Sequence, residues 1–110
     1  MGKFQISTRT NGEFQFNLSA DNGVNILTSE GYTTKASCLN GIESVRKNSQ
    51  DKDNFEQNVA KNGKFYFNLK AGNGQIIGTS QMYESEASCV NGLASVIKNA
   101  HNAELVDTTV

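Results

Sequence analysis

The sequence predicts an α+β fold in which two tandem βββα repeats share one sheet. Three observations predict this fold: the chain matches itself at a fixed offset, alternating apolar stretches flank Asn-Gly turns in each copy, and a helical periodicity ends each copy. A shift of 51 residues lays residues 11–49 over residues 62–100 without a gap, and more than half of the aligned pairs are identical. A match of this quality indicates an internal duplication.

Three short strands are predicted at the start of each copy. In the first copy, apolar and polar residues alternate over residues 4–9 and 14–19, and a third apolar stretch covers residues 24–29. Such alternation is typical of strands with one buried face. Asn11-Gly12 and Asn22-Gly23 separate the strands, and Asn-Gly favours a tight hairpin turn because both residues tolerate positive φ. Each copy therefore begins with an antiparallel three-stranded meander.

One helix is predicted at the end of each copy. Thr33-Thr34 and Ser85 supply N-caps, and the helices are expected to end near Asn48 and Asn99. Apolar residues at helical spacing predict the buried faces. These residues are Ala36, Cys38, Leu39, Ile42 and Val45 in the first copy, and Ala87, Val90, Leu93, Val96 and Ile97 in the second.

A glycine stands inside each predicted helix, in Asn40-Gly41 and in Asn91-Gly92. A glycine in a helix interior costs about 1 kcal/mol relative to alanine. Because this cost occurs twice at the same register, it predicts close backbone packing, against the sheet or against the other helix.

The two repeats are expected to form one domain over residues 1–110, with the first unit at 1–51 and the second at 52–110. A three-stranded sheet with one apolar face needs a cover, and each helix offers one apolar face. We therefore expect one continuous, antiparallel-type sheet with both helices on one face and a pseudo-two-fold axis between the units. Residues 104–107 read as the first strand of a truncated third copy. This strand, like the one that contains Phe55, is expected to cross over to the neighbouring unit and complete its sheet.

Two pairs of matching segments carry a family resemblance. NGEFQFNLSADNG matches NGKFYFNLKAGNG, and KASCLNGIESVRKNS matches EASCVNGLASVIKNA. With the TS…Y ends of the third strands, these segments resemble the YegP-like family of small bacterial proteins, a domain of unknown function with one or two copies of the repeat. The resemblance covers essentially the whole chain. It implies a βββα repeat, extended by a swapped strand, in a single sheet with helices on one side, and it implies no activity, cofactor or catalytic residue.

Composition narrows the function classes. The net charge of −1 and the isoelectric point near 5.7 give no field that would concentrate nucleic acid or anionic lipid. No apolar stretch approaches the ~18–20 residues that a membrane helix needs. Alternating sequence starts directly after Met1-Gly2, without the apolar region of a signal peptide. A soluble cytoplasmic protein is the expectation.

Candidate catalytic and metal-binding residues are few. Cys38 and Cys89 occupy equivalent helix positions and are expected to be free core thiols. With His101 as the single histidine of the chain, expected at an exposed helix end, no metal centre is predicted. No cofactor-binding motif is present either, because none of the Gly-containing turns has Walker or dinucleotide-binding spacing.

The polar face of the sheet is the candidate binding surface. If the helices cover the Phe and Leu side chains, alternation directs another set of residues away from them. This set is Gln5, Ser7, Arg9, Gln15, Asn17, Asn25, Leu27 and Ser29 in the first copy, and Asn58, Tyr66, Asn68, Lys70, Ile76 and Ser80 in the second. The ligand-binding residues proposed from this set are Gln15, Asn17, Tyr66, Asn68 and Lys70.

The sequence favours a non-enzymatic binding or interaction module that uses the open sheet face or an edge strand to hold a protein or small-molecule partner. A solvated face without a ligand is the plain alternative. A thiol-dependent enzyme acting through Cys38 or Cys89 is another alternative. So is a single-stranded nucleic-acid binder, although Tyr66 is the one aromatic residue expected on the face, whereas stacking platforms use two or three. A monomer is expected, with dimerisation through Leu27 and Ile76 or through a sheet edge as the alternative.

Overall fold

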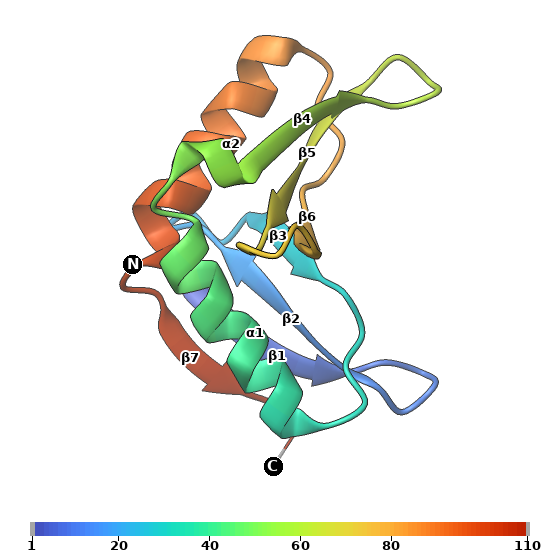
Figure 1. The fold of residues 1–110 in the computed structure, drawn as a ribbon, viewed down its shortest axis with the longest axis vertical. Helices are drawn as coiled ribbons and strands as arrows, with labels where there is room; N and C mark the ends of the chain where they lie inside the picture. Colours follow the sequence, from blue (N-terminus) through green and yellow to red (C-terminus); the bar gives the residue numbers. More distant parts are fainter. Residues whose placement is uncertain (1, 110) are drawn as a thin grey trace.

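The computed structural model describes residues 2–109, which form one sheet with a layer of helices on one face (Figure 1). The first half contains β1 (Lys3–Thr8), β2 (Phe14–Ser19), β3 (Asn25–Ser29) and α1 (Lys35–Asn48). A single 3-10 turn, η1 (Lys52–Asn54), leads into the second half. That half contains β4 (Phe55–Val59), β5 (Phe65–Lys70), β6 (Ile76–Thr79), α2 (Glu86–Ala100) and β7 (Glu104–Asp107).

The seven described strands lie in the order β4-β5-β6-β3-β2-β1-β7. All neighbours are antiparallel except β1 and β7, which are parallel. The predicted α+β fold with a single sheet is confirmed. β4 pairs with β5, whereas β7 runs back to the first half and pairs with β1, so each strand that follows a helix adds to the other unit.

The pseudo-two-fold axis passes through the centre of the sheet. Thr28 of β3 lies opposite Thr79 of β6, and these two residues are 51 positions apart, so each faces its own counterpart in the repeat. The two halves therefore meet through identical strands in an antiparallel arrangement. The predicted hairpins are present, but the expectation that both residues of each Asn-Gly pair take positive φ is wrong. Only the four glycines do, with φ between 82° and 86°, whereas a type I′ turn needs positive φ at both central residues.

The core lies between the sheet and the helices. Phe4 and Phe16 meet edge to face with ring centroids 5.8 Å apart, and Phe55 and Phe67 repeat the contact at 5.7 Å. Edge-to-face packing is a favourable geometry for aromatic rings. The first pair is fully buried, whereas Phe55 in the second pair is only half-buried.

The helix faces differ from the prediction by a rotation about the helix axis. The N-caps are Thr34 and Ser85, as expected, and each accepts a hydrogen bond from the third helical residue. The predicted face is wrong at Leu39 and Val90, which are 36% and 44% exposed, and at Ala36 and Ala87, which are also exposed. The buried faces of α1 and α2 instead centre on the two cysteines. They consist of Cys38, Gly41, Ile42 and Val45 in α1, and of Cys89, Gly92, Leu93, Val96, Asn99 and Ala100 in α2.

The glycine inside each helix makes room for a tyrosine. A Cβ atom at Gly41 would overlap the hydroxyl of Tyr32, and one at Gly92 would overlap the hydroxyl of Tyr83. Each tyrosine ring stacks on a core phenylalanine of its own unit. The predicted close packing is therefore present, with a tyrosine side chain as the neighbour of the helix.

A bulge in each unit makes part of the expected outer face of β3 and β6 wrong. The register shifts between Leu18 and Ser19 in the first unit, and between Leu69 and Lys70 in the second. An extra residue in a strand reverses the direction of every later side chain. The expectation that Leu27, Ser29 and Ser80 point away from the helices is therefore wrong: Leu27 is fully buried opposite Leu18, and the two serines are 4% and 7% exposed.

Leu27 consequently cannot mediate dimerisation through the outer face. It packs over Gly78, where a Cβ atom would lie 2.9 Å from the Leu27 side chain. Ile76 precedes the shifted part of its strand and stays 40% exposed.

Candidate binding face

A row of polar residues crosses the uncovered face of the sheet, opposite the helices. The strand register places neighbours of this row side by side from β1 to β4. In that order the row consists of Gln5, Asn17, Thr28, Thr79, Asn68 and Glu56. The residue 51 positions away from each member, its counterpart in the repeat, lies at the same distance from the centre of the row on the other side. The row is therefore symmetric in residue type, except that Gln5 at one end corresponds to Glu56 at the other.

Hydrogen bonds fix several members of this row. The hydroxyl of Thr79 donates to Oδ1 of Asn68 at 2.8 Å, and Nδ2 of Asn25 donates to Oγ1 of Thr28 at 2.9 Å. Asn68 is only 7% exposed. Its side chain therefore serves mainly to join β5 to β6, whereas Asn17 is half-buried and more accessible.

The five residues proposed from the sequence share this face but form two clusters. Gln15 and Asn17 lie on β2, and Tyr66, Asn68 and Lys70 lie on β5. Because β3 and β6 separate these strands, the clusters are about 14 Å apart at a strand spacing of about 4.8 Å.

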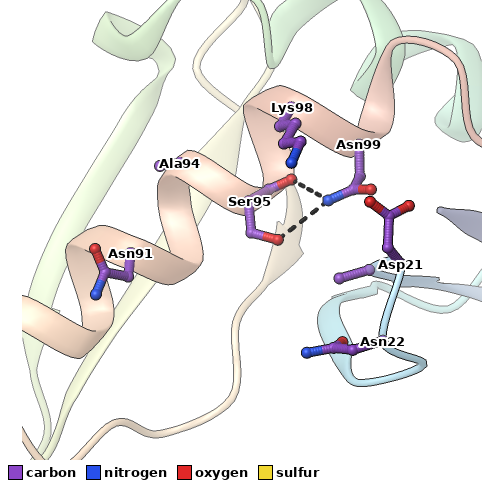
Figure 2. Close-up of a pocket in the computed structure, with 8 residues that line it drawn as sticks. Asp21, Asn22, Asn91, Ala94, Ser95, Lys98 and Asn99 are labelled. Carbon is purple, nitrogen blue, oxygen red and sulfur yellow. Dashed lines mark hydrogen bonds between the residues drawn. The ribbon is translucent and has the colours of Figure 1, made fainter. Parts of the chain in front are cut away.

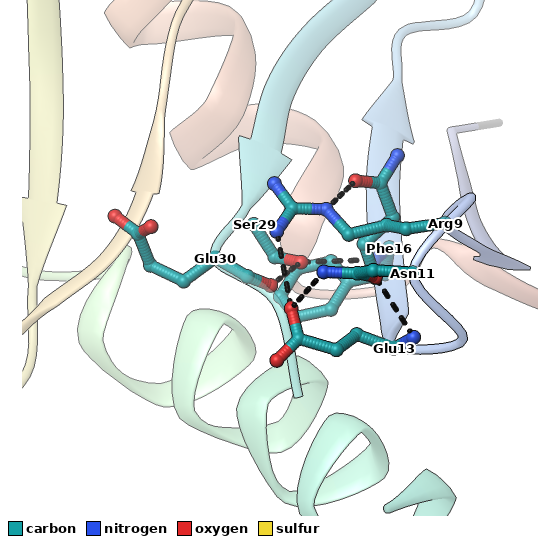
Figure 3. Close-up of polar contacts among 7 residues, drawn as sticks. Arg9, Asn11, Glu13, Phe16, Ser29 and Glu30 are labelled. Carbon is teal, nitrogen blue, oxygen red and sulfur yellow. Dashed lines mark hydrogen bonds and ion pairs between the residues drawn. The ribbon is translucent and has the colours of Figure 1, made fainter. Parts of the chain in front are cut away.

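The first cluster extends to the turn between β1 and β2, as Figure 3 shows. Arg9 donates from Nε to Gln15 at 2.9 Å, and its guanidinium forms an ion pair with Glu13 at 3.4 Å. Asn11 donates to the same carboxylate at 3.1 Å. This corner of the sheet thus offers one cation, one anion and two amides within one connected network.

A buried serine binds the strand that carries each cluster. Oγ of Ser29 accepts from the amide of Phe16 at 2.9 Å and donates to the carbonyl of Glu30 at 2.8 Å (Figure 3). Ser80 makes the same bonds to Phe67 and Gln81 in the second unit. Each serine hydroxyl takes the place of a backbone carbonyl as the acceptor for the phenylalanine amide. The buried hydroxyl thus has both a donor and an acceptor as partners.

Charge in the second cluster comes from Lys70 and Glu56. Nζ of Lys70 lies 2.8 Å from the Glu56 carboxylate. Hydrogen bonds from Lys70 and then from Asn58 hold the pKa of Glu56 below its ordinary value. The Glu56 carboxylate therefore stays ionised at neutral pH. Tyr66 lies beside it as the one aromatic side chain that the described strands present on this face.

The two thiols lie in the helix layer, away from this face. Cys38 is fully buried and Cys89 is 1% exposed. Burial raises the pKa of both thiols, and the nearby carboxylates of Asp107 and Glu86 respectively raise it further. A reactive cysteine needs the opposite environment, because the thiolate is the nucleophile.

Two further hollows lie where the turn of one unit meets the helix of the other. A hollow of about 380 Å³ lies between the β2–β3 turn and α2, and one of about 550 Å³ lies between the β5–β6 turn and α1. Figure 2 shows Asn91, Ser95 and Lys98 of the first hollow facing the turn that carries Asn22. The pseudo-two-fold axis relates the two hollows.

The sequence interpretation did not single out these hollows, although a signal was present. Four helical positions that are identical in the two copies and are not needed for the apolar core line these hollows. They are Asn40 and Asn91, Ser44 and Ser95, Lys47 and Lys98, and Asn48 and Asn99. Asn48 and Asn99 each donate to the serine four residues earlier (Figure 2 shows the second pair), so part of this set stabilises the helix ends.

The histidine, the possible metal ligands and the helix lengths can be described briefly. His101 is an exposed C-cap of α2. Within residues 2–109, no group of three or more His, Cys, Asp or Glu side chains is arranged to hold a metal ion. Neither described helix combines the length and apolarity that a membrane span requires.

Comparison with known proteins places this architecture in a family. Residues 10–56 and 60–107 each match the family described as a domain of unknown function, DUF1508. The chain belongs to this family. Each DUF1508 copy here begins at or just before the second strand of a unit and ends in the strand after its helix, which is the strand that joins the other unit.

The DUF1508 relatives are similar over nearly their whole length. The UPF0339 protein YegP of Escherichia coli K12 is 50% identical over 108 residues, which are 98% of this chain and 98% of that protein. A UPF0339 protein of Pseudomonas aeruginosa is 52% identical over 105 residues, 96% of each chain.

Solved DUF1508 structures share the fold. The solution NMR structure of YegP from Escherichia coli, titled a protein of unknown function, matches with a TM-score of 0.92 at 50% identity and covers 97% of this chain and 92% of its own. The NMR structure of a UPF0339 protein from Shewanella oneidensis matches with a TM-score of 0.91 at 51% identity, over 96% and 90%.

Proposed function

We propose that this chain is a non-enzymatic binding module that holds a protein or small-molecule partner on the outer face of its sheet. The observation that carries the proposal is the polar row from Gln5 to Glu56, repeated about the pseudo-two-fold axis on a face that neither helix covers. Two related polar clusters suit a ligand with two similar polar ends, or two copies of one ligand.

The alternatives fit the site less well. A thiol-dependent enzyme would need accessible thiolates, and both thiols are buried with raised pKa values. A nucleic-acid platform would need more stacking surface than Tyr66 supplies, and the net charge of −1 does not attract phosphates. We place the module in the cytoplasm, where both cysteines would stay reduced.

The test is an amide chemical-shift titration of labelled protein against pooled metabolites and short single-stranded oligonucleotides. We expect shifts to cluster on Gln15, Asn17, Tyr66 and Lys70. Shifts that cluster on the two hollows beside α1 and α2 would instead assign binding to the helix layer. Shifts from oligonucleotides alone would favour the nucleic-acid alternative.

A matched pair of variants gives the decisive control. Alanine at Gln15, Asn17, Tyr66 and Lys70 together should abolish binding and change the melting temperature little, because each side chain is partly exposed. Asn68 is left intact in this variant, because its bond to Thr79 makes it structural. The control places alanine at Asn40, Asn91 and Lys98 on the helices and should bind normally. Retained binding by the first variant would contradict the proposal.

A further inference from the structure

The outer edge of β4 resembles the outer edge of β1 with its covering strand removed. β7 lies parallel to β1, with Leu105 opposite Phe4 and Asp107 opposite Ile6. The amides of Glu104 and Thr108 donate to the carbonyls of Gly2 and Ile6 at 2.9 and 3.2 Å. β4 is the counterpart of β1 in the repeat, yet none of the described strands pairs with its outer side (Figure 1).

The free backbone groups of β4 can be identified from its partner β5. Gln57 lies opposite Phe67, and Val59 lies opposite Phe65. The backbone groups of both phenylalanines bond toward β6 and its extension, through Ser80 and Tyr83. Gln57 and Val59 therefore direct their own N–H and C=O groups away from β5, toward solvent. These groups form a template for one more strand.

This edge lacks the usual protection against strand addition. Natural edge strands carry Lys, Pro or a bulge that prevents pairing. The five residues of β4, Phe55–Val59, contain neither Lys nor Pro, and their pairing with β5 is regular. Val59 is 63% exposed.

Two hollows run along the helix side of the same edge. One of about 310 Å³ is lined partly by Phe55, Val90 and Leu93, and one of about 340 Å³ partly by Val59, Phe65 and Glu86. An added parallel strand in the β7 register would direct alternate side chains into this side of the sheet. The residue opposite Phe55 would meet the first hollow, and the residue opposite Gln57 would meet the second.

Charge distinguishes the two edges. In the first half, Nζ of Lys35 lies 2.9 Å from the carboxylate of Asp107, the β7 residue opposite Ile6. The counterpart of Lys35 in the repeat is Glu86. An added strand that kept the β7 register would therefore place its fourth residue beside a carboxylate.

We propose that the outer edge of β4 binds an extended peptide segment of another protein as a parallel strand, with an apolar residue opposite Phe55 and a Lys or Arg two positions later, beside Glu86. Strand addition of this kind gains affinity from backbone hydrogen bonds and specificity from alternate side-chain sites. The edge site is separate from the polar face, so a partner can use either surface alone.

The charge at Glu86 also disfavours the chain's own β7 as the occupant. A β7 strand from a second copy would satisfy the apolar position with Leu105 and would place Asp107 beside Glu86. Like charges in contact weaken binding. The edge therefore selects a foreign basic segment over another copy of this protein.

Two peptides test the proposal in the full chain. The first has the sequence of residues 103–109, and the second is the same peptide with D107K. The amide shifts of Gln57 and Val59 are followed as each peptide is added to millimolar concentration. The lysine peptide should bind about two- to five-fold more tightly, which is the range of a partly exposed ion pair.

Charge reversal supplies the matched control. Glu86→Lys should reverse the ranking of the two peptides, and α2 should tolerate the change because α1 carries Lys35 at the same helical position. Gln57→Pro removes one outward N–H group and should abolish binding of both peptides, since proline is accepted on the outer side of edge strands.

Three results would overturn the inference. They are the absence of binding by either peptide, equal affinities that Glu86→Lys does not change, and shifts that leave β4 unaffected. Broadening of the Gln57 and Val59 amides with protein concentration alone would show that a second copy occupies the edge. The alanine variant of the polar face should bind the lysine peptide normally, so failure of one proposal leaves the other standing.

Discussion

In the first half of the sheet, β1 is paired with β7 and its Phe4 and Ile6 are fully buried, whereas β4 in the second half leaves Phe55 half-buried and Gln57 exposed. The two halves otherwise repeat the same aromatic contacts, the same serine bonds and the same tyrosine–glycine packing. The duplication thus preserved these interior contacts of each unit, with Gly78 in place of buried Leu27 as an exception, and the units also differ at their outer edges. Substitutions at paired positions should show where the halves are equivalent and where they are not.

The largest expected difference is between Phe4→Ala and Phe55→Ala. Phe4 is fully buried and has the Arg46 guanidinium 4.9 Å from its ring centre, so its removal should lower the free energy of unfolding by about 3–5 kcal/mol. Phe55 is half-buried and should cost about 1–2 kcal/mol. Urea denaturation measures both values. Equal losses would mean that the open edge of β4 does not weaken the packing of the second half.

An intermediate effect is expected at the helix glycines, where the halves should behave alike. Gly41→Ala and Gly92→Ala should each destabilise the protein by about 1–2 kcal/mol, because overlap with a tyrosine hydroxyl outweighs the gain in helix propensity. Thermal denaturation measures the loss. Tyr83→Phe should rescue Gly92→Ala only in part, because the ring Cζ that the added Cβ would also overlap remains, and it should leave Gly41→Ala unchanged. Equal effects of Tyr83→Phe on both alanine variants would contradict the packing described above.

The smallest expected effect is a local loss of stability in acid at the edge where β7 covers β1. Hydrogen bonds from Thr109 and then from Lys35 lower the pKa of Asp107 from 3.8 to about 2. Because the folded-state pKa is depressed, the stabilising contribution is present above pH ~4 and is lost as pH falls toward about 2. The protection factor of the Thr108 amide, which donates to Ile6, should fall over this range once the intrinsic exchange rate at each pH is divided out.

The control for this effect is Asp107→Asn, which removes the titrating group. Exchange at Thr108 should then be faster than in the wild type at neutral pH and should lose its acid step. The Gln57 amide on the open edge should show no corresponding step in either protein. A shared step at Thr108 and Gln57 would indicate global acid unfolding in place of local release of β7.

Most of the fold could be predicted because the sequence pattern of each strand, turn and helix occurs in both copies of the repeat. The Asn-Gly hairpins and the Thr34 and Ser85 caps follow from local residue preferences, whereas the single sheet follows from the need to cover the apolar faces of two equal units. The helix faces were harder to predict, because Leu39 and Val90 are apolar yet exposed. Helical periodicity alone does not distinguish two adjacent apolar stripes.

The bulges explain the errors on the candidate face. Strict alternation predicted the correct face for Asn17 and Asn68, which precede the register shift. It predicted the wrong face for Leu27 and Ser29, which follow the shift. The same shift brings Thr28 and Thr79 to the face, where the sequence interpretation did not place them. In the first unit no residue type marks the bulge, which leaves both Ile26 and Leu27 buried on one side of the sheet. In the second unit Gly78 stands at the position of Leu27, and a glycine inside a strand is a signal for a bulge.

The pairing of Thr28 with Thr79 has a consequence for how such a protein assembles. Each half presents to the other the same strand in the same register, which is the arrangement of an isologous dimer. A chain with one unit would carry a self-complementary edge and would associate in a concentration-dependent manner. The short connection through η1 makes that association intramolecular and holds the second half at a high effective concentration beside the first.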